Sequence, residues 1–256
     1  MPVPPFYTEA MTAAQLSEAT QEYLESIYWL YESGIERTQA NLARALQVSQ
    51  PSVSEMLKRM ADDELVSRDE SKQIHFTERG RGVAERIVAR HRLVEAYLVK
   101  VMGIPWDDVH EEAHAMELSI SPRLEAKMLE MIGDIKTCPH GHPIGDYPRA
   151  PGEALPAVPV GSTLVVLRLE NEAEEMLHYM KRHGVEPGHR FEVTGRRGDG
   201  DEAETELTGD AGSAWVLDAL ARTVSVRVES RGDGPVSHLS AAGAELQLVG
   251  EGRWGM

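Results

Sequence analysis

The sequence has a single cysteine, Cys138, and no long apolar run. One cysteine excludes an internal disulfide framework, and no apolar stretch reaches the roughly 20 residues that a membrane-spanning helix needs. The first residues, MPVPPFYTEAM, lack the basic and apolar regions of a secretory signal. We therefore expect a cytoplasmic protein without a membrane partner.

Basic residues are scarce as well. The 256 residues include 26 Lys and Arg against 42 Asp and Glu, a net charge of −16, and residues 1–80 alone contain 7 basic and 13 acidic residues. A nucleic-acid-binding protein usually carries a basic surface. The acidity is explained either by an ordinary soluble protein or by DNA binding that needs a divalent cation to offset repulsion from phosphate.

The first 80 residues contain the pattern of a winged helix-turn-helix. Apolar residues at helical spacing predict a helix over 16–31. Two further helices, over 38–48 and 49–66, are joined by about three residues, as in a helix-turn-helix. Two short extended runs around the polar turn DESK follow within 65–80, before Thr77 caps the next helix. This hairpin is the predicted wing.

Small polar residues crowd the first turns of the helix predicted over 49–66, the end that a recognition helix presents to base edges. Basic residues lie farther along this helix and in the hairpin, where phosphate contacts would position the domain without specifying sequence. A solvated helix face would be polar in the same way. The candidate DNA-binding residues are Ser49, Gln50, Pro51, Ser52, Ser54, Lys58, Arg59 and Lys72, with Arg68 as a further basic residue among them.

The composition and periodicity of the sequence change twice after residue 80. Helical patterns continue to about residue 135, and proline and glycine then become frequent, as in linkers. The remainder alternates short strands with glycine-rich turns around one helical segment, 172–184, which predicts a small antiparallel β-barrel. We expect an α+β multidomain chain with a winged helix-turn-helix DNA-binding domain over 1–79, a helical domain over 80–142, a Pro-rich linker over 143–159 and a small β-barrel over 160–250.

One predicted helix carries three candidate metal ligands on one face. His110, His114 and Glu117 are separated by four and three residues, so two imidazoles and a carboxylate stack along the helix. The preceding helix repeats the four-residue spacing with His91 and Glu95. Polar pairs at these spacings are frequent on helix surfaces, so any single pair would carry little weight.

The first helix adds a third donor pair, Glu22 and Glu25, three residues apart. Three pairs beside one helix-turn-helix favour a metal site over ordinary surface residues. The donors are carboxylates and imidazoles without thiolate or thioether, a set that suits manganese or ferrous iron better than copper or a cysteine-rich zinc site. We expect a divalent transition metal, with Mn²⁺ as the first choice and Fe²⁺ as the second.

Five blocks of sequence follow one another over about residues 19–145: TQEYLESIYWL, LARALQVSQPSVSEMLKRM, ERGRGVAERIVARHRLVEAYLV, GIPWDDVHEEAHAMELSIS and TCPHGHPIG. In this order they resemble the diphtheria toxin repressor family, which includes iron- and manganese-dependent repressors. LPAVPVGSTLVVLRL and MKRHGVEPGHRFEV resemble the SH3-like, FeoA-type domain that many members carry. The resemblance implies that the barrel is SH3-like and that the helical domain binds metal and dimerises.

The resemblance also implies two neighbouring metal sites between the DNA-binding and dimerisation domains. Residue-by-residue correspondence assigns one set of ligands to a site that triggers DNA binding and another to an ancillary site. The implied trigger ligands are Glu22, His114 and Glu117, and the implied ancillary ligands are His91, Glu95 and His110.

Three further positions complete the implied ligand sets. Glu25 matches a ligand of manganese-dependent members and could join either site, and Glu172 is the candidate ligand from the C-terminal domain, although acidic residues are also favoured at helix starts. Family members carry a histidine directly after the glutamate that matches Glu117, whereas this chain has Leu118, which cannot coordinate. Either His114 compensates, or the trigger site is weak and the ancillary site dominates.

Together these features predict a metal-dependent repressor and no enzyme. A homodimer would bind a pseudo-palindromic double-stranded DNA operator when metal is bound, and the family implies metal-homeostasis genes as targets. The alternatives are a metal-handling adaptor and a metallohydrolase, which would need an open coordination position and a nearby base. The predicted dimer face comprises Leu98, Val101, Met102, Ile120, Leu124 and Met128, for which a core role is the alternative.

Overall fold

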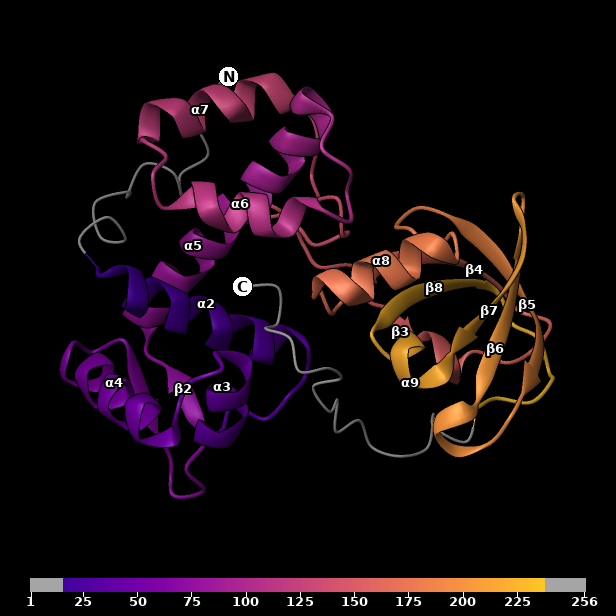
Figure 1. The fold of residues 1–256 in the computed structure, drawn as a ribbon, viewed down its shortest axis with the longest axis horizontal. Helices are drawn as coiled ribbons and strands as arrows, with labels where there is room; N and C mark the ends of the chain where they lie inside the picture. The colour runs from indigo at the N-terminus through magenta and orange to yellow at the C-terminus, as the bar shows by residue number, and fades with distance from the viewer. Residues whose placement is uncertain (1–15, 238–256) are drawn as a thin grey trace. The chain divides into compact units, whose positions relative to one another are not determined.

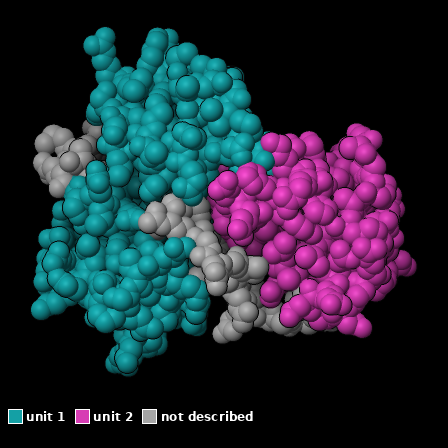
Figure 2. All heavy atoms as spheres, in the orientation of Figure 1, with its two compact units in different colours: residues 1–138, 143–147, 250–256 teal, residues 139–142, 148–249 magenta. Residues whose placement is uncertain are grey.

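The computed structural model describes residues 16–237, which divide into two compact units (Figure 2). The first unit includes residues 16–138 and 143–147, and the second includes 139–142 and 148–237. Helices dominate the first unit and an antiparallel sheet dominates the second (Figure 1). Over the described residues, no helix has both the length and the apolar character needed to cross a bilayer.

Three helices open the first unit. Helix α2 spans Glu18–Glu32, α3 spans Gln39–Ala45 and α4 spans Gln50–Asp62. Thr38 and Ser49 cap α3 and α4 with their hydroxyl groups, which accept hydrogen bonds from backbone N–H groups that have no partner within the helix. The order α3, short turn, α4 confirms the predicted helix-turn-helix.

The wing follows directly after α4. Strands β1 (Val66–Arg68) and β2 (Ile74–Phe76) pair antiparallel, with Val66 opposite Phe76. Their connecting turn includes Lys72, which has a positive φ of 65°, a conformation that non-glycine residues adopt mainly in tight turns. The hairpin therefore lies where the sequence predicts it.

Four consecutive helical segments complete most of the first unit. Helix α5 (Glu78–Tyr97) starts at its cap Thr77 and continues into a π-helical turn, Leu98–Met102. Helices α6 (Val109–Glu117) and α7 (Pro122–Ile132) follow. Figure 1 shows α6 and α7 beside α5, so α5 is the central helix of this part of the unit.

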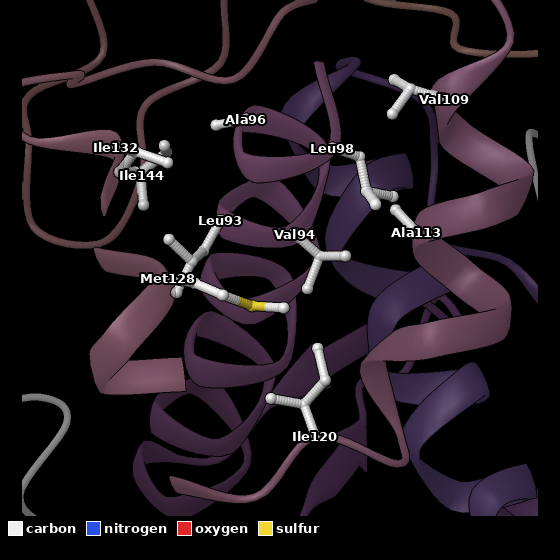
Figure 3. Close-up of a cluster of buried hydrophobic side chains, with 10 residues drawn as sticks. All are labelled: Leu93, Val94, Ala96, Leu98, Val109, Ala113, Ile120, Met128, Ile132 and Ile144. Carbon is white, nitrogen blue, oxygen red and sulfur yellow. The ribbon is translucent and has the colours of Figure 1, made fainter. Parts of the chain in front are cut away.

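The predicted dimer face divides into buried and exposed residues. Apolar side chains of α5, α6 and α7 form a common core (Figure 3), and half of the predicted face belongs to it. Helical periodicity identifies the apolar residues but does not say which of them pack inside the protomer. The buried residues are Leu98, Ile120 and Met128, and the exposed ones are Val101, Met102 and Leu124.

The second unit is a six-stranded antiparallel sheet with strand order β3-β8-β4-β5-β6-β7. Its edge strands among the described residues are β3 and β7, so its ladder is open rather than closed on itself. The strands are β3 (Glu153–Ala154), β4 (Thr163–Leu169), β5 (Arg190–Arg197), β6 (Glu204–Gly209), β7 (Gly212–Leu217) and β8 (Val224–Ser230). The helices are α8 (Glu174–Arg182), α9 (Asp218–Ala221) and the 3-10 turns Leu155–Ala157 and Gly200–Glu202. Residues 238–250 of the barrel predicted over 160–250 lie outside the described residues.

The structure differs from the predicted linker over residues 148–159. This segment contributes the edge strand β3 and a 3-10 turn to the second unit. Arg168 donates a hydrogen bond to the carbonyl oxygen of Ala150 (2.8 Å), and Arg196 donates to those of Pro156 (3.2 Å) and Val158 (2.6 Å). Proline lacks an N–H group but keeps its carbonyl acceptor, so a proline-rich segment is ordered here by arginine side chains of β4 and β5.

Candidate metal centre and nucleic-acid interface

Three buried donor atoms meet between α5 and α6. The Nε2 atom of His91 lies 3.1 Å from Nδ1 of His110, and Oε1 of Glu95 lies 3.1 Å from the first and 3.0 Å from the second. All three side chains are at most 3% exposed. The packing of α5 against α6 therefore brings the predicted ancillary ligands together.

Glu117 joins this group to His114. Its Oε2 atom lies 2.9 Å from Nδ1 of His91, and its Oε1 atom lies 3.1 Å from Nδ1 of His114. Glu25 enters from α2, with carboxylate oxygens 3.7 Å from His91 and 4.0 Å from His114. The two sites implied by the sequence are therefore contiguous and meet at His91 and Glu117.

A cavity of about 120 Å³ adjoins the α2 side of this cluster. Its lining includes Glu22, Glu25, His114, Glu117 and Leu118. The predicted trigger ligands thus face one common space. Leu118 faces the same space, so the position without a donor borders the cavity directly.

The cluster shifts the acidity of its own members. Burial opposes protonation of His91, but the negative charges of Glu95 and Glu117 outweigh it, and the pKa of His91 is well above its ordinary value. Burial likewise opposes ionisation of Glu117, but the adjacent charge of His91 and the hydrogen bond from His114 prevail and lower its pKa. The carboxylates around His91 therefore favour positive charge at this position.

Trp29 is a further residue of this cluster that the sequence analysis missed. Its buried ring packs edge-on against His91, with centroids 5.6 Å apart, and lies tilted against the ring of His110, with centroids 5.4 Å apart. Its position in α2 offers a signal that could have found it, because Trp29 follows Glu22 and Glu25 by seven and four residues and shares their helix face. The indole covers the two imidazoles on the α2 side.

Glu172 lies in the second unit. Its Oε1 atom is 3.2 Å from Nε2 of His142 and 3.7 Å from Nδ1 of His140, both of the same unit. The imidazole of His142 also contacts the carbonyl oxygen of Leu169 at 2.9 Å. The role of Glu172 as a metal ligand stays a prediction.

The cluster of the first unit fits a divalent cation. Glu25, Glu95 and Glu117 bring three buried carboxylates against the imidazoles of His91 and His110. Buried charges are costly unless they are paired or coordinate a metal, and carboxylate with imidazole is a donor set for manganese or iron. Oxygen and nitrogen atoms that lie about 3 Å apart and face one another can share one cation.

The predicted base-reading residues lie at the exposed N-terminal end of α4. Ser49 accepts a hydrogen bond from the backbone N–H of Ser52 (3.3 Å), and the two hydroxyls lie 2.8 Å apart. Capping thus occupies part of their hydrogen-bonding capacity. The residues of this end, all exposed, are Ser49, Gln50, Pro51, Ser52 and Ser54.

The basic residues of the same face differ in their partners. Lys58, Arg59 and Lys72 are exposed, and Arg59 forms an ion pair with Glu55 at 2.5 Å within α4. In the wing, Asp69 accepts a hydrogen bond from the hydroxyl of Ser71 and pairs with His75, which lowers the pKa of Asp69 to about 2. Asp69 thereby fixes the turn that carries Lys72.

Comparison with known proteins matches the chain to two models of iron-dependent repressors. The N-terminal DNA-binding domain matches residues 15–74, and the metal-binding and dimerisation domain matches residues 77–146. The chain is 32% identical over 202 residues to the iron-dependent repressor IdeR of Mycobacterium tuberculosis, and the matched region covers 73% of this chain and 88% of the relative. It is 29% identical over 225 residues to the diphtheria toxin repressor of Corynebacterium glutamicum, which covers 82% and 96%.

Solved structures with the same fold include metal-dependent repressors. A manganese-dependent transcriptional repressor in complex with manganese superposes with a TM-score of 0.74 at 31% identity, covering 82% of this chain and 99% of that one. The IdeR structure from T. acidophilum gives a TM-score of 0.70 at 25% identity, covering 84% and 99%. These matches extend across both units of the chain.

Proposed function

This chain belongs to the iron-dependent repressor family of metal-dependent transcriptional repressors, with a DNA-binding domain and a metal-binding dimerisation domain, and from this premise we propose that it is a manganese-responsive repressor of metal-homeostasis genes. Fe²⁺ is the second candidate metal. The relatives named above are repressors, which are not enzymes, and we propose no catalytic activity.

One observation carries the proposal: the buried cluster joins α2, which belongs to the DNA-binding domain, to α5 and α6 of the dimerisation domain. Glu25 of α2 lies 3.7 Å from His91 of α5 and 4.0 Å from His114 of α6. A bound divalent cation would supply positive charge and coordination bonds at this junction. Glu22 and Glu25 would then hold α2 in one orientation, and a ligand that prefers this orientation shifts the population toward it.

The donor chemistry supports manganese as the first choice. Glu22, Glu25 and Glu117 contribute oxygen atoms and His114 contributes nitrogen, a set without sulfur, which suits hard or intermediate cations. His91, Glu95 and His110 repeat this chemistry at the ancillary site. Intrinsic affinity would favour copper or zinc over manganese, so selectivity for manganese rests on coordination number and on the metals that the cell supplies.

A homodimer is proposed from the apolar residues that the core leaves uncovered. Val101 and Met102 of the π-helical turn and Leu124 and Met131 of α7 are 40–60% exposed. Exposed apolar patches mark interaction surfaces, and a two-fold dimer presents two recognition helices to a pseudo-palindromic operator. The N-terminal end of α4 would read base edges, and Lys58, Arg59 and Lys72 would contact phosphates.

The experiment that tests this function is selection of DNA from a random duplex library with the full-length chain. The selection is run with Mn²⁺, Fe²⁺, Zn²⁺ or excess chelator at one ionic strength, followed by footprinting of the enriched duplexes. A protected pseudo-palindrome that requires Mn²⁺ or Fe²⁺ supports the proposal. Protection that persists in chelator would contradict metal dependence, and the absence of any enriched sequence would favour a metal-handling adaptor.

A further inference from the structure

The side chain of Gln39 connects the three parts of the winged helix. Gln39 is the first residue of α3, and its Nε2 atom donates a hydrogen bond to the carbonyl oxygen of Gln50, the first residue of α4, at 2.7 Å. Its Oε1 atom accepts a hydrogen bond from Nη2 of Arg68 in β1 at 3.0 Å. The two partners fix the amide orientation, since a carbonyl can only accept and a guanidinium can only donate.

This arrangement leaves the Gln50 carbonyl free to serve α4 as well, because a carbonyl oxygen has two lone pairs. The guanidinium of Arg68 is consequently linked to the N-terminal end of α4 by two successive hydrogen bonds through Gln39. That end is the part of a recognition helix that enters the major groove, so a helix α4 bound in this way would bring Arg68 next to the groove edge, where the DNA backbone passes.

The charge of Arg68 distinguishes it from the other arginine of this face. Arg59 is paired with Glu55, whose carboxylate offsets its positive charge. Among the residues that the structure describes, Arg68 makes no ion pair, and its hydrogen-bond partner Gln39 is neutral. A guanidinium has five N–H donors in a planar fork that matches a phosphate, so Arg68 keeps its full charge and further donors for DNA.

We propose that Gln39 is a positioning residue for DNA binding, which holds Arg68 beside the recognition helix as a preorganised phosphate contact. The inference rests on the proposed repressor function and assigns Gln39 no contact of its own with DNA. Preorganisation lowers the entropy cost of immobilising a long side chain on binding. Gln39 therefore acts only through Arg68, and this dependence can be measured.

The test is a double-mutant cycle with the full-length chain, Mn²⁺ and a duplex enriched from a random library, followed by fluorescence anisotropy over a series of KCl concentrations. Arg68→Ala should weaken binding about tenfold and reduce the salt slope by roughly 0.9 for each phosphate that the side chain neutralises. Gln39→Ala should weaken binding by a smaller factor, about threefold to fivefold. In the Arg68→Ala background, Gln39→Ala should have almost no further effect.

Equal factors for Gln39→Ala with and without Arg68 would overturn the inference, because Gln39 would then contact DNA itself or act on the fold in general. Gln39→Glu provides a second variant: its carboxylate can still accept from Arg68 but offsets the charge, so binding should fall to the level of Arg68→Ala. Wild-type affinity in Gln39→Glu would also overturn the inference. A wild-type chain that enriches no duplex would contradict the proposed function and this inference together, whereas additive effects contradict only the inference.

Discussion

The metal cluster and the DNA-binding face of the first unit use charge in opposite ways. In the cluster, Glu25, Glu95 and Glu117 are almost completely buried and lie against imidazoles. On the DNA-binding face, Lys58 and Lys72 are exposed to solvent. Electrostatic interactions are several times stronger in a buried environment than in water. Removal of one charge should therefore have a larger effect in the cluster than on the DNA-binding face.

This difference indicates which single substitutions should have large effects on DNA binding and which should have small ones. Removal of one partner from a buried group leaves the others uncompensated and is strongly disruptive. Removal of an exposed charge changes affinity for a polyanion by a small, salt-dependent and nearly additive amount. The cluster should therefore behave as a switch, and the DNA-binding face as a sum of small contributions.

The largest expected effects arise within the cluster, and the first is that of Glu117→Ala. Glu117 bridges His91 and His114, so its removal separates the two parts of the cluster. Mn²⁺-activated DNA binding should fall by at least about 100-fold, as expected when a ligand that supports other ligands is removed. Anisotropy titrations with the enriched duplex measure this, with the exposed residue Glu112 of the same helix replaced by alanine as the control. Activation within threefold of wild type would show that Glu117 is not part of the switch.

His114→Ala and Leu118→His test the departure of this chain from the family pattern. Both positions line the same cavity as Glu22. If His114 supplies the nitrogen ligand, His114→Ala should abolish Mn²⁺-activated DNA binding while calorimetry still detects metal at His91, Glu95 and His110. Leu118→His should strengthen metal binding or change metal preference. Full metal-dependent repression by His114→Ala would instead assign the switch to the ancillary group.

Metal binding should weaken as the pH is lowered. The carboxylates of Glu95 and Glu117 raise the pKa of His91 despite its burial, and a metal ligand must be deprotonated. Metal therefore displaces a proton, and affinity should fall about tenfold per pH unit for each proton displaced. The raised pKa of His91 also affects stability without metal. Protonated His91 stabilises the fold at pH values below the pKa of His91 in the unfolded chain, and this contribution is lost as the pH rises through the pKa of His91 in the folded chain.

Calorimetric Mn²⁺ titrations in buffers with different heats of protonation, from pH 6 to pH 8, measure the proton released. A Mn²⁺ affinity that does not change over this range would contradict protonation of His91. Unfolding of the metal-free chain by urea at the same pH values provides the matching stability measurement.

The smallest expected effects belong to the exposed basic residues. Lys72→Ala should weaken binding severalfold on every duplex and reduce the salt slope by roughly 0.9 per phosphate contact. Arg59→Ala should have less effect, because Glu55 already offsets the charge of Arg59. Substitutions at Gln50 or Ser52 should change sequence preference instead. Comparison of enriched and scrambled duplexes separates these outcomes, and a change in base preference caused by Lys72→Ala would contradict the assignment.

Local sequence patterns were sufficient to predict most of the first unit. The cap Thr77, the short turn between α3 and α4 and the hairpin after α4 all depend on interactions within a few residues. The same holds for the donor spacings, because His110, His114 and Glu117 share a helix face by geometry alone. Local rules thus indicated which side chains could converge.

Tertiary packing decided what local patterns left open. The sequence does not reveal that Glu117 contacts His91 or that Trp29 covers both imidazoles, since these contacts join different helices. The strand order of the second unit was also left open, because β4 pairs with β8, which lies far later along the chain. Burial of Met128 and exposure of Met102 likewise depend on how α5 and α7 pack.

The central claim is that metal at the buried cluster controls DNA binding. The most direct test follows Trp29 fluorescence and operator anisotropy in one titration with Mn²⁺ at fixed ionic strength, with Trp29→Phe to identify the signal of Trp29. We predict that both signals change over the same range of free Mn²⁺ and that excess chelator reverses both. Tight operator binding in excess chelator, or DNA binding that saturates without any change at Trp29, would contradict the claim.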